Sequence, residues 1–187
     1  MHRTVRIACA LLSVIATACQ RAVRHDEPSD APAVSQSRAD FLKDTVLGVV
    51  HYSSGREFDT RKPVLRDSLG VLLKAQRALW QAAAPRDHRF LLRVQCFCPG
   101  QKGWQLVEVR GGQLRAWDSS GKAAATGDWS VFTIDQLYDN LLRGLERPAM
   151  VNIVFDARWH FPSYVRWSAP VYPDSWSITE IRAFRPN

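Results

Sequence analysis

The clearest apolar pattern in the chain lies between Pro63 and Pro85. Large apolar residues recur there at spacings of three and four, as on one face of a helix. A proline suits the first turn of a helix, and a later proline ends it. The pattern therefore predicts an amphipathic helix that starts at Pro63 and ends before Pro85. Its apolar face consists of Leu65, Leu69, Leu72, Leu73, Leu79 and Trp80.

From His88 to Cys98 the pattern changes to alternation, which is typical of a half-buried strand. The apolar face of this strand consists of Phe90, Leu92, Val94, Cys96 and Cys98. Pro99-Gly100 stops the pairing, so we expect both cysteines near the rim of a sheet. Residues 104–110 and 113–117 then flank Gly111-Gly112, which predicts a hairpin.

A second helix is predicted from Thr133, because Thr133-Ile134-Asp135-Gln136 forms a capping box. Phe132 and Leu137 fit a hydrophobic staple at the same junction. An apolar stripe continues to Pro148, and three strand candidates follow at residues 150–156, 163–168 and 177–184.

The order of elements is thus helix, three strands, helix, three strands. It predicts a single α+β domain over residues 63–187, an antiparallel β-sheet with two main helices packed on one face. The pattern leaves the order of the strands open. Residues 41–62 form an arm or an edge strand.

The N-terminal segment has the pattern of a signal peptide. Residues 1–6 carry two arginines, and residues 7–18 are uncharged and mostly apolar. Such a core is too short for a membrane-spanning helix, which needs about 20 residues, but it fits a signal peptide. Residues 16–19, Ala-Thr-Ala-Cys, resemble the lipobox of bacterial lipoproteins, with Ala16 in place of the usual leucine. An ordinary signal peptide cut after Ala18, with a free thiol at Cys19, is the alternative.

The lipobox resemblance implies that residues 1–18 are removed and that Cys19 is acylated, which gives the chain a membrane partner through its lipid. In such lipoproteins an Asp after the cysteine favours the inner membrane; Gln20 here implies the inner leaflet of the outer membrane, facing the periplasm. Residues 19–40 contain few bulky apolar residues and predict a flexible tether.

Composition narrows the class of partner. The 187 residues carry a formal charge of +7, and the basic residues are scattered along the chain. A nucleic-acid-binding protein usually gathers its positive charge into a patch or along one helix face. We therefore expect no nucleic acid among the partners.

From Trp80 to the C-terminus the chain resembles a family of uncharacterised bacterial secreted proteins and lipoproteins, the domain of unknown function numbered 6174. The matching features are Trp80, Cys96-Phe97-Cys98, Gly111-Gly112, Thr133-Ile134-Asp135-Gln136-Leu137, Asp156, Pro162 and Phe184. The family usually has Gly two residues before the proline of its turn, where this chain has His160. The resemblance implies a fold and an envelope location, and it implies no activity.

If Cys9 is removed with the signal peptide and Cys19 carries the lipid, Cys96 and Cys98 are the two cysteines that remain in the mature protein. Alternate residues of a regular strand lie roughly 6.5–7 Å apart, at the upper edge of disulfide geometry. A kink at Pro99-Gly100 would bring them into range. Three interpretations stay open: a local disulfide, a reduced pair packed as small apolar residues, and a redox or metal role.

Aromatic residues supply the candidate binding positions. The chain has seven tryptophans, and several lie beside loops in its C-terminal two-thirds. The candidates are Trp117, Trp129, Trp159, Tyr164 and Trp176. Tyr172 lies close to Trp176 in the sequence. Exposed aromatic rings could stack on sugar rings or anchor a protein partner. Packing within the sheet is the alternative.

No set of residues has the spacing of a catalytic triad, a metal site or a cofactor site, so we predict no enzyme, no cofactor and no metal. The sequence favours an outer-membrane-anchored periplasmic lipoprotein that acts as a non-enzymatic binding or accessory module for an envelope protein. Binding of cell-wall glycan through the Trp-rich loops is the alternative. A redox or metal role at the Cys-x-Cys pair is the second alternative.

Overall fold

The computed structural model describes residues 55–98, 103–125, 127–169 and 175–187. The predicted signal peptide, Cys19, the tether and most of the predicted arm lie outside the described residues. The described elements, in chain order, are β1 (Arg56–Asp59), α2 (Pro63–Ala83), β2 (His88–Cys96), β3 (Gln105–Arg110), β4 (Gln113–Trp117), α3 (Ile134–Gly144), β5 (Met150–Phe155), β6 (Pro162–Ser168) and β7 (Trp176–Pro186).

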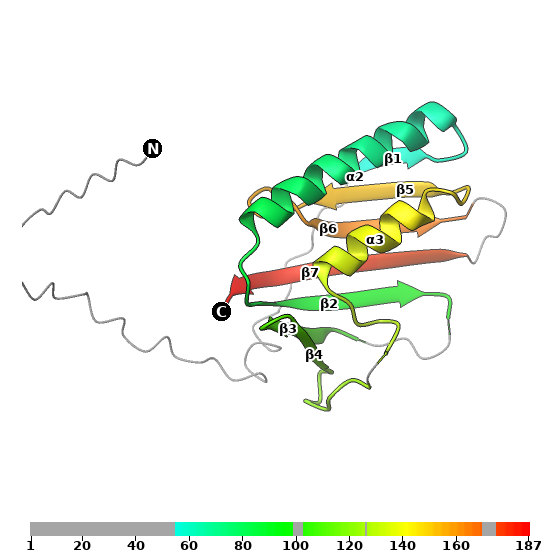
Figure 1. The fold of residues 1–187 in the computed structure, drawn as a ribbon. Helices are drawn as coiled ribbons and strands as arrows, with labels where there is room; N and C mark the ends of the chain where they lie inside the picture. The colour runs from blue at the N-terminus through cyan, green and yellow to red at the C-terminus, as the bar shows by residue number, and fades with distance from the viewer. Residues whose placement is uncertain (1–54, 99–102, 126, 170–174) are drawn as a thin grey trace, which may run out of the picture. The chain divides into compact units, whose positions relative to one another are not determined.

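All seven strands form one sheet in the order β1-β5-β6-β7-β2-β3-β4. Every neighbouring pair is antiparallel. Both helices lie on the same face of this sheet (Figure 1). The predicted α+β fold is therefore confirmed, and its long last strand, β7, takes the central position.

Both helices begin where the sequence predicts. Pro63 occupies the first turn of α2, which buries Leu69, Leu73 and Trp80. At the start of α3 the Thr133 hydroxyl accepts a hydrogen bond from the Gln136 amide at 3.1 Å. Gln136 Oε1 accepts one from the Thr133 amide at 2.8 Å. This reciprocal cap satisfies two N–H groups that the helix itself cannot.

The main core lies between the helices and the sheet. Its largest fully buried side chains include Trp80, Tyr138, Phe90 and Phe161. A second, smaller apolar cluster lies on the face of the sheet away from the helices. There Leu91 and Leu106 are fully buried, and Trp104 and Trp117 pack against them. The prediction that β2 is half-buried is thus wrong at Leu91, since β2 buries apolar side chains on both faces.

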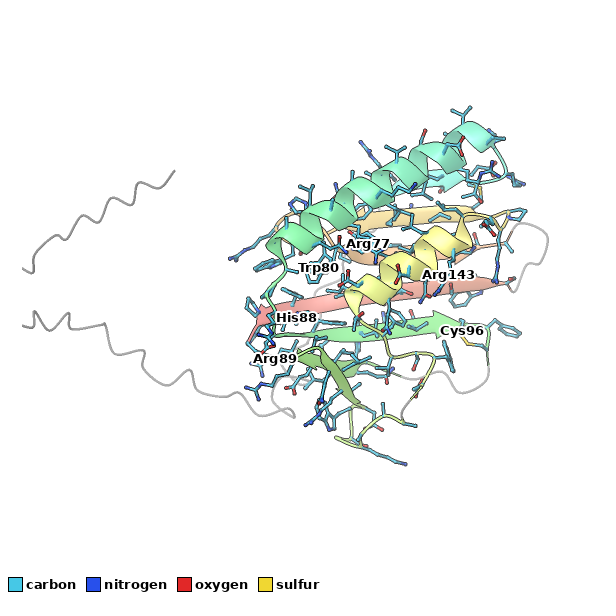
Figure 2. All side chains as sticks on the ribbon, viewed as in Figure 1. Arg77, Trp80, His88, Arg89, Cys96 and Arg143 are labelled. Carbon is cyan, nitrogen blue, oxygen red and sulfur yellow. A yellow bond between two sulfur atoms is a disulfide. The ribbon has the colours of Figure 1, made fainter. Side chains whose placement is uncertain are left out.

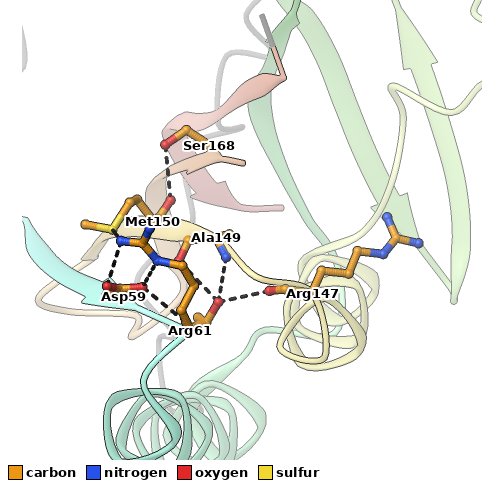
Figure 3. Close-up of polar contacts among 7 residues, drawn as sticks. Asp59, Arg61, Arg147, Ala149, Met150 and Ser168 are labelled. Atoms are coloured by element: carbon orange, nitrogen blue, oxygen red, sulfur yellow. Dashed lines mark hydrogen bonds and ion pairs between the residues drawn. The ribbon is translucent and has the colours of Figure 1, made fainter. Parts of the chain in front are cut away.

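The short edge strand β1 is tied to the segment between α3 and β5 (Figure 3). The Thr60 hydroxyl donates to the Arg147 carbonyl at 2.9 Å and accepts from the Ala149 amide at 2.8 Å. Asp59 pairs with Arg61 at 2.8 Å, and the Arg61 guanidinium lowers the pKa of the Asp59 carboxyl. These contacts fix β1 against β5, although the hydrophobic pattern did not single out β1 as a strand.

A β-bulge in β7 directs an aromatic side chain into the core. The register with β2 shifts between Arg89 and Leu91, and Ala183 adopts a positive φ of 50°. Regular alternation would place Ile181 and Phe184 on opposite faces of the sheet. The extra residue lets both pack into the core beneath the helices.

The turn before β6 also contains a residue with positive φ. His160 has a φ of 64°, and its carbonyl accepts a hydrogen bond from the Tyr138 hydroxyl at 2.6 Å. The turn is closed by Asp156, whose carboxylate accepts from the amides of Arg158 and Trp159. A glycine at this position, which the resemblance to the family implies, would adopt this backbone conformation without strain.

We expect His160→Gly to stabilise the protein. A non-glycine residue in this region costs about 1–2 kcal/mol, whereas the added chain entropy of glycine costs about 0.5–1 kcal/mol. The net gain should be roughly 0.5–1 kcal/mol in chemical denaturation. His160→Ala retains a Cβ and should bring no such gain. An alanine variant as stable as the glycine variant would contradict this explanation.

Candidate binding surfaces

The Cys96-Phe97-Cys98 segment forms a tip at one end of the sheet (Figure 2). Strand β2 ends at Cys96, two residues earlier than predicted, and the chain bends at Phe97 and Cys98. The bend brings the two cysteine Cα atoms to 5.2 Å, with their sulfur atoms close together. Phe97 between them is 74% exposed. The sequence pattern indicated the two cysteines as a candidate site, but it placed Phe97 within the strand and gave no sign of its exposure.

The five aromatic candidates differ in exposure. Trp129 is 53% exposed, whereas Tyr164 is buried at 6%. Trp117 packs on the second apolar cluster and Trp159 on the main core. Trp176 is half-buried at the start of β7. Tyr172 lies outside the described residues. Of the five, Trp129 presents the most open ring surface, and Tyr164 presents almost none.

Trp129 lies beside a shallow groove on α3. The groove has a volume of about 450 Å³. The helix lines it with Gln136, Asp139, Asn140 and Arg143, and the preceding loop lines it with Trp129 and with the apolar side chains of Val131 and Phe132. Asp128 orders the loop that carries Trp129, because its Oδ1 accepts hydrogen bonds from the amide and hydroxyl of Ser130. An exposed indole is thus held next to four polar side chains.

The face of the sheet away from the helices carries a charged cluster. Glu180 is 1% exposed and accepts hydrogen bonds from Arg93 on β2, through Nε at 2.6 Å and through Nη2. Arg182 donates to its other carboxylate oxygen at 2.9 Å. Both guanidinium groups lie over the ring of Trp104, at 4.6 and 5.1 Å. Two cations thus share one buried carboxylate and one aromatic face.

Three of the exposed large apolar side chains in the described residues belong to α2. They are Val64, Val71 and Leu79, which are 75%, 70% and 46% exposed. Val71 also lines a hollow between the two helices, together with Leu142 and Leu145 of α3. The helix therefore has apolar residues on its outward face as well as on the face that packs on the sheet.

His88 lies in an aromatic cluster at the opposite end of β2 from the cysteines (Figure 2). Its ring contacts Trp80 edge-on, with centroids 5.5 Å apart, and stacks on Phe90. Nδ1 lies 2.9 Å from the Pro85 carbonyl, so a neutral ring with its proton on Nδ1 fits this site. Burial lowers the pKa of His88, against smaller opposing effects of the Pro85 hydrogen bond and of the Asp135 and Asp87 charges.

We expect this burial to make folding stability depend on pH. In the unfolded chain a histidine has a pKa of about 6.5, and the folded-state pKa of His88 lies below that value. The unfolded state therefore binds more protons, so the contribution of His88 is present above about pH 6.5 and is lost as the pH falls through the folded pKa. Urea denaturation between pH 5 and 7.5 should show a smaller pH slope for His88→Leu than for the parent. Equal slopes would contradict this assignment.

No three His, Cys, Asp or Glu side chains within residues 55–98, 103–125, 127–169 and 175–187 gather as metal ligands. None of the helices in these ranges has the length and apolarity required to cross a bilayer.

Comparison with known proteins defines the family of the chain. Residues 72–168 match the family of unknown function DUF6174. The match starts within α2 and ends with β6, so it spans the Cys-x-Cys tip, the hairpin and α3. The chain therefore belongs to this family, as the motifs of the sequence indicated. No curated protein and no solved structure matches the chain significantly.

Proposed function

We propose that the protein is a lipid-anchored, non-enzymatic binding or accessory module of the bacterial outer membrane, which engages an envelope protein in the periplasm. The observation that carries this proposal is the 74% exposure of Phe97 at the tip of β2. Aromatic residues, including phenylalanine, are enriched in protein interfaces relative to the rest of the protein surface. An exposed phenylalanine on a short, constrained segment is well suited to that role.

The two cysteines give the tip its constraint. With Cα atoms 5.2 Å apart, Cys96 and Cys98 fall within the usual range for a disulfide, and the periplasm is an oxidising compartment. We propose that they are bonded there. The closed ring would hold Phe97 outward and reduce the conformational entropy that a partner must remove on binding.

The location rests on the N-terminal pattern. Residues 1–6 are basic, residues 7–18 are apolar and Cys19 follows small residues, which together favour a lipoprotein signal. Gln20 supports the outer membrane as the destination. A tether of about 20 residues would give the domain a reach of roughly 25 Å from the lipid.

Site-specific photo-crosslinking in intact cells tests the proposal. A photoreactive phenylalanine analogue is placed at position 97, and a matched control carries it at Gln113, an exposed position on β4. We expect one discrete protein adduct from position 97 and none from position 113. The adduct should also fall when unlabelled parent protein is co-expressed. The same weak, diffuse products from both positions would contradict a protein-binding role for the tip.

A further inference from the structure

We propose that the groove beside Trp129 is a carbohydrate-binding site for acetamido- and carboxylate-bearing amino sugars, the chemistry of cell-wall glycan. The site lies on α3 and the loop before it, and it is separate from the Phe97 tip in sequence. Its assignment to cell-wall glycan rests on the proposed envelope location, whereas the groove and its chemistry do not.

The indole of Trp129 supplies the platform. It is 53% exposed and follows Asp128, whose carboxylate accepts the hydrogen bonds from Ser130 that order the turn containing Trp129. A large, rigid aromatic surface that already stands in water can pack against the apolar C–H face of a sugar ring. Because the loop is ordered by its own hydrogen bonds, little conformational entropy is lost when the ligand binds.

The rest of the groove is lined mainly by hydrogen-bonding groups. Gln136, Asn140 and Arg143 are all exposed and follow one another along one side of α3. The oxygens of both amides already accept hydrogen bonds: Gln136 Oε1 from the Thr133 amide, and Asn140 Oδ1 from Arg143 at 2.6 Å. Their NH₂ groups and the outer N–H groups of Arg143 are the groups that a ligand can use.

A surface rich in donors selects a ligand rich in acceptors. Acetamido carbonyls would accept from the two amide NH₂ groups, and a lactyl carboxylate would pair with Arg143. Asp139 provides an acceptor for sugar hydroxyls, and its charge is balanced by Arg77 at 2.8 Å. A protein partner would instead favour a desolvated apolar centre, whereas in this groove the polar side chains outnumber the apolar ones, which are Trp129, Val131 and Phe132.

Isothermal titration of the folded protein tests the site. The probes are the disaccharide of N-acetylglucosamine and N-acetylmuramic acid, the tetramer of N-acetylglucosamine, and cellotetraose, which lacks acetamido and carboxylate groups. We expect dissociation constants on the order of 0.1–1 mM for the first two probes and at least tenfold weaker binding of cellotetraose.

Variants separate the roles of the residues. Trp129→Ala should weaken both amino-sugar probes by about tenfold or more. Arg143→Gln should weaken the muramic acid disaccharide by about fivefold and leave the N-acetylglucosamine tetramer within about twofold. Phe97→Ala is the control: it removes an exposed aromatic ring elsewhere and should leave all three titrations unchanged. Thermal unfolding of each variant shows that the domain remains folded.

Three results would overturn the carbohydrate site. They are no binding of either amino-sugar probe at millimolar concentration, equal binding of cellotetraose, or unchanged binding by Trp129→Ala. Loss of the protein adduct at position 97 in the Trp129→Ala strain, without any sugar binding, would reassign the groove to a protein partner. Because the titrations do not involve Phe97, failure of this site leaves the protein-binding proposal standing, and the reverse holds as well.

Discussion

Glu180→Gln is expected to lower the free energy of unfolding by about 2–4 kcal/mol. The substitution keeps the size of the side chain and removes its charge, which leaves Arg93 and Arg182 close together without a shared anion. Glu180 is 1% exposed, so water cannot reach this site to replace the lost charge interaction with the two arginines. Removal of one partner from a buried ion pair usually costs about 3–5 kcal/mol. We reduce that figure because the side chains of Arg93 and Arg182 are 28% and 15% exposed.

Glu57→Gln is the matched control for this substitution. Glu57 is an exposed glutamate on β1, in the same sheet, and its substitution should change stability by less than about 0.5 kcal/mol. Urea denaturation at neutral pH measures both variants. If Glu180→Gln proved as stable as Glu57→Gln, the charged cluster would not contribute to the fold as we describe.

Cys19→Ser is expected to move nearly all of the protein from the membrane fraction to the soluble periplasm. Without the thiol there is no site for the lipid, and cleavage after Ala18 would leave residues 19–40, which contain few bulky apolar residues, at the N-terminus. Fractionation followed by intact-mass measurement of the mature N-terminus gives both the location and the modification.

Gln20→Asp provides the matched control for the anchor. It keeps Cys19, so the protein should stay lipidated. Because an Asp directly after the lipid-bearing cysteine favours the inner membrane, the variant should move there from the outer membrane. Continued membrane association of Cys19→Ser would contradict the lipoprotein assignment. An unlipidated parent protein, cut after Ala18, would support the ordinary signal peptide instead.

The elements that the sequence predicted well are those whose signals are local. The cap of α3 depends on Thr133 and Gln136, three residues apart, and its hydrogen bonds are present as expected. The hairpin depends on Gly111 and Gly112, which both have positive φ, at 55° and 78°. Short-range chemistry of this kind can be recognised without knowledge of the rest of the fold.

The features that the sequence did not predict depend on partners distant in the chain. The bulge that turns Phe184 inward exists because β7 pairs with β2, about 90 residues earlier. Tyr164 is buried on a strand that has neighbours on both sides, whereas Trp129 is exposed on a loop. Composition treats these aromatic residues alike, because exposure depends on strand order and not on residue type.

The candidate sites show the same limit. Alternation predicted that Cys96 lies on the inner face of β2, and it extended the strand through Phe97 and thus treated that residue as part of a sheet. The bend after Cys96 changes its role, since it leaves Phe97 exposed at the tip. For the groove on α3, the helical spacing of Gln136, Asn140 and Arg143 could have been noticed, but only the loop geometry brings Trp129 beside them.

The central claim is that Phe97 anchors a protein partner in the envelope. The most direct test compares the proteins crosslinked to the parent and to Phe97→Ala in intact cells, with each strain isotopically labelled and quantified by mass spectrometry. We predict one partner that is depleted at least tenfold in Phe97→Ala and unchanged in Gln113→Ala. Equal recovery of every crosslinked protein from the parent and from Phe97→Ala, at equal levels of folded protein, would contradict the claim.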